Sequence, residues 1–224
     1  MQKITAIIFS AITLLFSFSA QADTNPYAKW YQVELIVFSH ITAQGLNSER
    51  WSWTNPQFVA KSQAFEPTMT NDLKLKSEEA HIEKQPGYKV LMHVAWRQQI
   101  QHPRYARPIH IFGGNVYSAS GKILATDADG QMKYNNQHVW QVNGTIKISV
   151  RRYFDLNANL LFALPTDQLN ETFKDNSSDN LQGHFAYFRL LQSRRMRSKE
   201  LNYIGHPLYG LLLKVTPLDI KETT

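Results

Sequence analysis

Four long segments of this chain alternate apolar with polar side chains, and this two-residue period constrains the fold more than any other feature. The segments are 29–38, 88–99, 138–154 and 184–197. They are also rich in β-branched and aromatic residues, which favour strands. Because successive side chains of a strand point to opposite faces, the pattern predicts long strands that are each buried on one side.

Shorter apolar runs at 108–112, 115–119, 158–164 and 208–216 add further strands, and Asp155-Leu156-Asn157 is expected to turn the chain between two of them. Residues 72–84 predict one helix, which Asn71 or Asp72 would cap and Pro86-Gly87 would end. Since helices and strands do not alternate along the chain, a doubly wound fold is not expected. The prediction is a β-rich α+β fold: mainly an antiparallel sheet of long strands, with one main helix and long loops.

The first 22 residues have the three parts of a secretory signal peptide. Lys3 provides the positive charge, Ile4 to Phe18 form the apolar stretch, and Ala20-Gln21-Ala22 gives the small residues of a cleavage site. We expect cleavage after Ala22 and a single mature domain, 23–224, in the periplasm. An uncleaved membrane anchor remains the alternative. No later stretch is long and apolar enough to span a bilayer, so no integral membrane segment is expected after the signal is removed.

The composition excludes several classes of protein. The chain has no Cys, which excludes disulfides, a lipid-modified N-terminal Cys and thiolate zinc sites. No nucleotide-binding fingerprint and no metal-binding spacing of His occurs, so no cofactor is predicted. The net charge is +6, one unit of which leaves with Lys3. For an exported protein this charge favours anionic glycans, lipid head groups or peptidoglycan carboxylates over nucleic acid as partners. The alternative is a charge that serves solubility and has no partner.

Several runs of sequence resemble the cell-shape-integrity (CsiV) family. They are Tyr31–Phe38, Tyr88–Gln98, Gly144–Tyr153 and, most specifically, Arg194–Gly210. The resemblance implies an exported, non-enzymatic protein of Gram-negative bacteria that binds peptidoglycan and supports cell-wall synthesis and cell shape. Where the family pattern more often has His and Asp, this chain has Asn202 and Gly205, so no catalytic role is transferred to those positions. The resemblance supplies no ligand residues.

The strand periodicity proposes a binding surface independently of the resemblance. Basic side chains share the polar faces of three predicted strands: Lys89, His93 and Arg97; Lys147 and Arg151; Arg195 and Arg197. If these strands are neighbours, their basic side chains form one cationic strip. Arginine suits carboxylate recognition because its planar guanidinium donates two parallel hydrogen bonds. The alternative is an ordinary solvated sheet face with scattered ion pairs.

Two tryptophans are further candidates for ligand binding. Trp51 and Trp53 lie on one side of an extended segment, where their indoles could stack on sugars. The alternative is that they cover the edge of the core. Trp96 and Trp140 have apolar neighbours and are expected in the core.

These observations favour a non-enzymatic periplasmic protein that binds peptidoglycan. Its further partners would be cell-wall synthesis proteins or their activators. Two alternatives stay open: an exported cell-wall hydrolase whose site is not visible in the linear sequence, and an envelope-assembly adaptor that pairs a partner strand with an exposed sheet edge.

Overall fold

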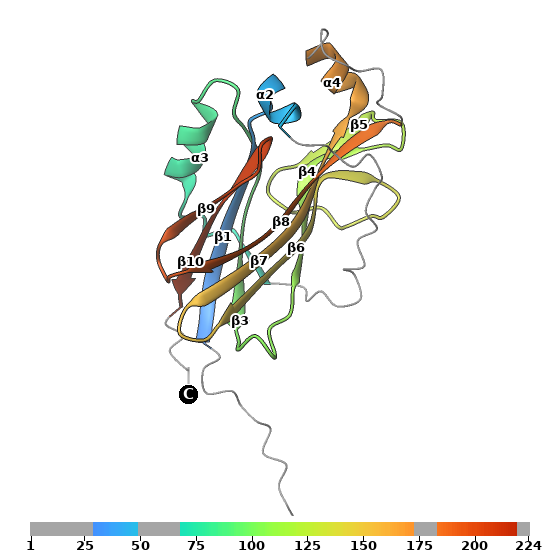
Figure 1. The fold of residues 1–224 in the computed structure, drawn as a ribbon. Coiled ribbons are helices and arrows are strands. Elements are labelled where there is room, and N and C mark those ends of the chain that lie inside the picture. Colours follow the sequence, from blue (N-terminus) through green and yellow to red (C-terminus); the bar gives the residue numbers. More distant parts are fainter. Residues whose placement is uncertain (1–28, 49–67, 173–182, 219–224) are drawn as a thin grey trace, which may run out of the picture.

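The computed structural model describes residues 29–48, 68–172 and 183–218, which form two five-stranded antiparallel sheets packed face to face (Figure 1). Sheet A has the order β2 (Thr68–Thr70), β3 (Lys89–Ile100), β1 (Lys29–Ser39), β10 (Tyr209–Pro217), β9 (Leu201–Gly205). Sheet B has the order β5 (Ile123–Asp127), β4 (Ile109–Tyr117), β6 (Val139–Val150), β7 (Phe154–Pro165), β8 (Phe185–Met196). The helices are α2 (Ala43–Leu46), α3 (Lys76–Glu83) and α4 (Thr166–Thr172). The predicted β-rich, antiparallel class is confirmed.

The main core lies between the two sheets. From sheet A, alternate residues of β1 such as Val33 and Leu35 point inward, and from sheet B so do Leu160 and Phe162 of β7. Trp96 of β3 is fully buried among them, as its apolar neighbours in the sequence predict. Burying a large apolar side chain stabilises a fold by about 1.5–3 kcal/mol, so this layer provides most of the driving force for the sandwich.

Tyr209 of β10 joins the two sheets across the core. Its side chain is fully buried, and its hydroxyl lies 3.1 Å from the carbonyl oxygen of Leu160 and 3.4 Å from that of Phe188. Those carbonyls belong to β7 and β8 of the opposite sheet. Burial raises the pKa of the tyrosine hydroxyl, which therefore stays protonated and able to donate a hydrogen bond.

Helix α3 covers part of the outer face of sheet A (Figure 1). Leu75, at the start of the helix, and Ile82 pack on Ile36 and Phe38, which are the outward-facing residues of β1. The helix is thus held by a small second core, and this part of the sheet is buried on both faces.

Two edge strands meet at one corner of the sandwich. Side chains of β8 donate hydrogen bonds to backbone carbonyls of β9: Gln192 Nε2 to Gly205 O (2.9 Å) and Arg194 Nη1 to Tyr203 O (2.8 Å). Both carbonyls lie on the edge strand of sheet A, so side chains of sheet B satisfy acceptors that have no partner strand there.

Two local features differ from the sequence prediction. The turn between β6 and β7 is at residues 151–153, and the Asp155-Leu156-Asn157 segment that was expected to turn lies inside β7.

In β3 the register shifts between Met92 and Val90. Val90 therefore packs on the small core under α3, while Met92 packs in the main core. Such a bulge reverses the faces of the residues that precede it.

Gly113 and Gly114 form a bulge in β4. The pairing of β4 with β6 shifts register after Gly113, and Gly114 has φ +76°. Only glycine adopts this left-handed conformation without strain. The bulge therefore makes one continuous strand, β4, of the two short strands expected at 108–112 and 115–119.

Candidate functional site

The basic residues proposed from the sequence do not form one strip. Lys89 and Arg97 lie on β3 of sheet A, whereas Lys147 and Arg195 lie on β6 and β8 of sheet B, with β7 between those two strands. The condition for a single strip, three neighbouring strands, is not met. The pairing order that decides this depends on contacts between distant segments, which no local pattern encodes.

His93 does not belong to an exposed basic surface, because α3 covers its side chain. The side chain faces outward from the sheet, as its alternation predicts, but is 4% exposed. Its Nε2 lies 2.9 Å from Glu34 Oε1, and its Nδ1 lies 2.8 Å from Glu79 Oε2. Both ring nitrogens are thus used within the protein, which leaves neither for a ligand.

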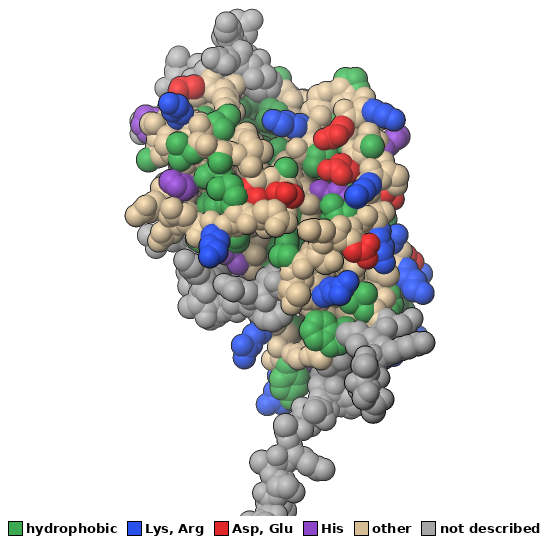
Figure 2. All heavy atoms as spheres, turned by 180° about the vertical axis from the view of Figure 1, so that it is seen from behind, with side chains coloured by type: hydrophobic (Ala, Val, Ile, Leu, Met, Phe, Trp, Pro, Cys, Tyr) green, Lys and Arg blue, Asp and Glu red, His purple; other side chains and the backbone are tan. Residues whose placement is uncertain are grey.

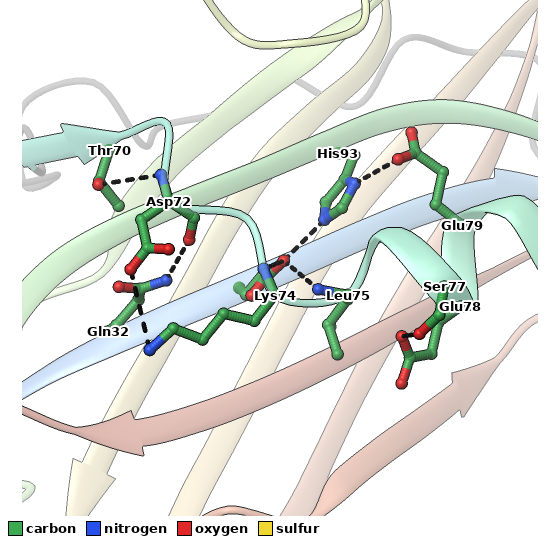
Figure 3. A network of polar contacts seen from close by, with 10 residues as sticks. Gln32, Thr70, Asp72, Lys74, Leu75, Ser77, Glu78, Glu79 and His93 are labelled. Carbon is green, nitrogen blue, oxygen red and sulfur yellow. Dashed lines mark hydrogen bonds and ion pairs between the residues drawn. The ribbon is translucent and has the colours of Figure 1, made fainter.

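Glu34 of β1 connects this histidine to the helix. Its Oε1 also accepts hydrogen bonds from the backbone N–H groups of Lys74 and Leu75, each at 2.7 Å, where α3 begins (Figure 3). The helix has no side-chain cap of its own at Leu75, so the carboxylate of a distant strand takes the role that Asn71 or Asp72 was expected to play. A negative charge at this end also complements the helix dipole.

The protonation of His93 follows from its two carboxylate neighbours. Burial by itself lowers the pKa of the imidazole, but the hydrogen bonds and charges of Glu34 and Glu79 outweigh burial and raise the pKa above its ordinary value of 6.5. The two carboxylates thus favour the protonated form of the ring, and this cluster stabilises the packing of α3 on the sheet.

A second group of charged residues lies at the end of the sandwich where β3 and β6 finish. We call it the basic end: Lys147, Arg151, Arg152, Arg195, Arg104 and Arg107. Arg151 and Arg152 occupy the turn after β6, so Arg151 is not on the strand face where the sequence placed it. The guanidinium groups of Arg152 and Arg195 lie 5.7 and 5.5 Å from the ring centre of Tyr153, within the range of cation–π attraction.

The arginines of the basic end have no ion-pair partner among the residues that the structure describes. Within the described parts of the chain, no ion pair joins any of the five to a carboxylate, although Asp155 lies opposite Arg195 in the β7–β8 register. Arg197, in the turn after β8, forms an exposed ion pair of 3.7 Å with Glu200. In Figure 2, Lys and Arg side chains predominate at the lower end of the molecule, whereas most acidic side chains lie higher.

The basic end contains a cavity of about 560 Å³. Its described lining residues are Trp30, Gln99, Gln101, Arg104, Tyr105, Ala106, Arg107 and Ile148. Two aromatic rings, two amides and two guanidinium groups therefore surround one space, and none of these lining residues is acidic. A cavity of this volume is within the range of small-ligand sites.

Backbone hydrogen bonds fix the walls of the cavity. In the loop between β3 and β4, the N–H groups of Tyr105 and Ala106 donate to His102 O at 2.8 and 3.0 Å. Val150 N donates to Gln101 O at 2.9 Å, which joins this loop to the end of β6 beside the arginine-containing turn (Figure 1). The opposite wall is held by Leu218 N, which donates to Trp30 O at 2.9 Å.

Sequence reasoning missed the cavity, although the sequence carries a signal for it. Arg104, Tyr105 and Arg107 lie in a short segment bounded by Pro103 and Pro108. Two prolines restrict a loop, and cationic and aromatic residues in a restricted loop are typical of binding sites. The strand periodicity that predicts the basic faces assigns no role to this loop.

The other residues predicted to bind a ligand lie on exposed or partly exposed surface, or outside the described residues. Arg97 is exposed and Lys147 is partly exposed on the outer face of its sheet, while Lys89 is exposed at the start of β3 beyond the bulge. Trp51 and Trp53 lie outside the described residues.

No helix in the described part of the chain has the length and apolar character needed to cross a membrane. The described residues also contain no group of three or more His, Asp or Glu suited to a metal ion.

Comparison with known proteins identifies one family. The model of a family described as "Peptidoglycan-binding protein, CsiV" matches residues 53–218, more than two thirds of the chain. The match confirms the resemblance seen in the sequence, and it includes the β3–β4 loop and the β6–β7 turn of the basic end. Neither a curated protein nor a solved structure shows significant similarity to the chain.

Proposed function

The chain belongs to the CsiV family of peptidoglycan-binding proteins, and from this premise we propose that it binds peptidoglycan in the periplasm through its basic end, without catalysing a reaction. In this proposal the signal peptide 1–22 is removed after Ala22, and the mature chain 23–224 supports cell-wall synthesis and cell shape. Cell-wall synthesis proteins or their activators are the further partners we propose.

The observation that supports the basic end as the binding surface is the group of arginines without ion-pair partners described above. An arginine that forms no ion pair keeps its hydrogen-bonding capacity for an external anion. Peptidoglycan offers such anions on its peptide stems, which carry free carboxylates. The ion pairs that neutralise charge inside the protein lie elsewhere: Glu34 and His93 lie under α3 on the outer face of sheet A, and α3 itself contributes Glu79.

Sedimentation of the mature protein with purified sacculi tests the proposal. Wild type should sediment with the sacculi, and the bound fraction should fall as salt rises from about 50 to 300 mM, because screening weakens exposed charge pairs. The variant Arg151→Gln/Arg195→Gln should bind more weakly. A matched control, Lys84→Gln/Lys122→Gln, makes the same charge change at exposed positions near the other end of the strands and should bind like wild type.

The same preparation separates binding from hydrolysis. Soluble muropeptides released from the sacculi during incubation would show that the protein is a hydrolase and would overturn the non-enzymatic part of the proposal. Failure of wild type to sediment with sacculi at low salt would overturn peptidoglycan binding itself.

A further inference from the structure

We propose that the cavity at the basic end binds the terminal carboxylate of a peptidoglycan stem peptide, an inference that rests on the function proposed above and specifies the part of the polymer that is recognised. The cavity contains two arginines, Arg104 and Arg107, and its described lining includes no acidic residue. A site with this charge favours an anion. The glycan strand of peptidoglycan is largely neutral, because the carboxyl group of its lactyl ether is bound in the amide that carries the stem, whereas the stems end in free carboxylates.

The other lining residues suit a short peptide. Gln99 and Gln101 provide amide groups that can donate to and accept from peptide bonds. Trp30, Tyr105 and Ile148 provide apolar surface that suits the methyl groups of alanine. Carboxylate, peptide bonds and small methyl groups occur together at a stem that ends in D-alanine, and the volume of about 560 Å³ accommodates only a few residues.

The loop that carries both arginines is already ordered by its own hydrogen bonds to His102 O and by the bond from Val150 N to Gln101 O. Binding therefore requires little additional ordering of the backbone, which favours affinity for a small ligand. Arg104 also lies with its guanidinium carbon 5.7 Å from the ring centre of Tyr105, which restricts its side chain without neutralising its charge.

The cavity and the arginine-containing turn would then have different roles. Arg151, Arg152 and Arg195 are outside the described cavity lining and attract the polymer over a longer range. Arg104 and Arg107 would donate directly to the carboxylate in charge-assisted hydrogen bonds. The two sets of residues can be changed independently.

Titration with a defined tripeptide tests this division of roles. The probe is N,N′-diacetyl-L-lysyl-D-alanyl-D-alanine, compared with the same peptide as its C-terminal amide, with NMR chemical shifts of the mature protein as the readout. The acid form should bind at least about tenfold more tightly than the amide, and its shifts should centre on the Trp30 indole and on residues 99–107. Arg104→Gln/Arg107→Gln should weaken binding of the acid at least about tenfold, with an unchanged melting temperature because both side chains are exposed.

Arg151→Gln/Arg195→Gln is the matched control: it should bind the tripeptide within about twofold of wild type, yet bind sacculi less well. Equal affinity for acid and amide, or an unchanged affinity in Arg104→Gln/Arg107→Gln, would overturn carboxylate binding in the cavity. If wild type sediments with sacculi but no tripeptide shifts appear, the stem-peptide inference is wrong and the proposed function stands. If wild type does not bind sacculi, the proposed function is wrong, whatever the tripeptide does.

Discussion

Two charged regions of this molecule differ in what neutralises them. Under α3, the imidazole of His93 meets Glu34 and Glu79, and Glu34 also accepts two backbone N–H groups. At the basic end, Arg104 and Arg107 face a cavity whose described lining contains no acidic residue. A buried charge must be neutralised within the protein, because leaving it unpaired is expensive, whereas an exposed charge can remain available to a ligand. The difference separates charges that hold the fold from charges that can bind.

The largest effect on stability should follow from removing the centre of the covered network. Glu34→Ala leaves His93 and the start of α3 without their shared acceptor. We expect the free energy of unfolding to fall by about 3–5 kcal/mol, which corresponds to a loss of roughly 10 °C in melting temperature for a domain of this size. Thermal denaturation followed by circular dichroism measures it. The control is Glu83→Ala, at an exposed position of the same helix, which should change the melting temperature by no more than a degree or two.

A smaller, pH-dependent effect should follow from replacing His93. Because its pKa is raised in the folded state, the bonds to Glu34 and Glu79 contribute stability fully below the ordinary pKa of 6.5, and this contribution is lost as the pH rises through the folded-state value. Wild type should therefore exceed His93→Gln in stability by the largest margin in mildly acidic buffer. Chemical denaturation between pH 5.5 and 9 measures the margin. A margin that grows with pH would show that the ring is neutral in the folded protein.

The second buried histidine should respond to pH with the opposite sign. His206 has no carboxylate among the causes of its shift, and burial followed by the nearby His40 lowers its pKa to about 4. The unfolded chain therefore takes up a proton near the ordinary value of 6.5 that the folded protein does not accept until about pH 4. Stability should fall as the pH decreases through this window, and His206→Gln should flatten that decrease. The histidine also has a structural role, since its Nδ1 accepts a hydrogen bond from Leu208 N at 3.2 Å.

The smallest effect on stability should come from the basic end. Arg151→Gln/Arg195→Gln removes exposed charges that form no ion pair with any described residue, so the free energy of unfolding should change by less than about 0.5 kcal/mol. Chemical denaturation next to the sacculus measurement checks this result. Pronounced destabilisation would mean that these arginines support the fold, and the contrast between the two regions would then fail.

The sequence was sufficient for the long strands, but not for the short strands β2, β5 and β9 or for the arrangement of the strands in sheets. Alternation located β1, β3, β6 and β8, because a strand with one face in the core must alternate wherever it pairs. The division into two sheets does not follow from local pattern, since it is set by contacts between distant segments such as β1 and β10.

The misplaced turn after β6 has a local explanation. Asp155 and Asn157 are residue types typical of turns. In this protein they lie on the outer face of β7, where a strand accepts polar side chains, opposite Ser149 and Lys147. Arg151 and Arg152, which lie at the actual turn, are not typical turn residues. The error moved Arg151 onto a strand and contributed to the expectation of a basic strip.

The site was only partly predictable for a related reason. The outward direction of His93 followed from periodicity, but its burial under α3 depends on how a helix from another part of the chain packs. The cavity similarly requires Trp30 from β1, Ile148 from β6 and a loop after β3 to converge. A sequence pattern can identify residues suited to binding, whereas convergence is a property of the fold.

The corner where β8 covers β9 has a consequence for how the protein behaves in a crowded compartment. An edge strand with free carbonyls can pair with a strand of another molecule, which is a common route to aggregation. Gln192 and Arg194 already occupy the carbonyls of Gly205 and Tyr203, so a second chain would have to displace both side chains before it could extend sheet A at this edge. The protein can therefore accumulate along a polymer that concentrates many copies, with one route to strand-by-strand growth closed.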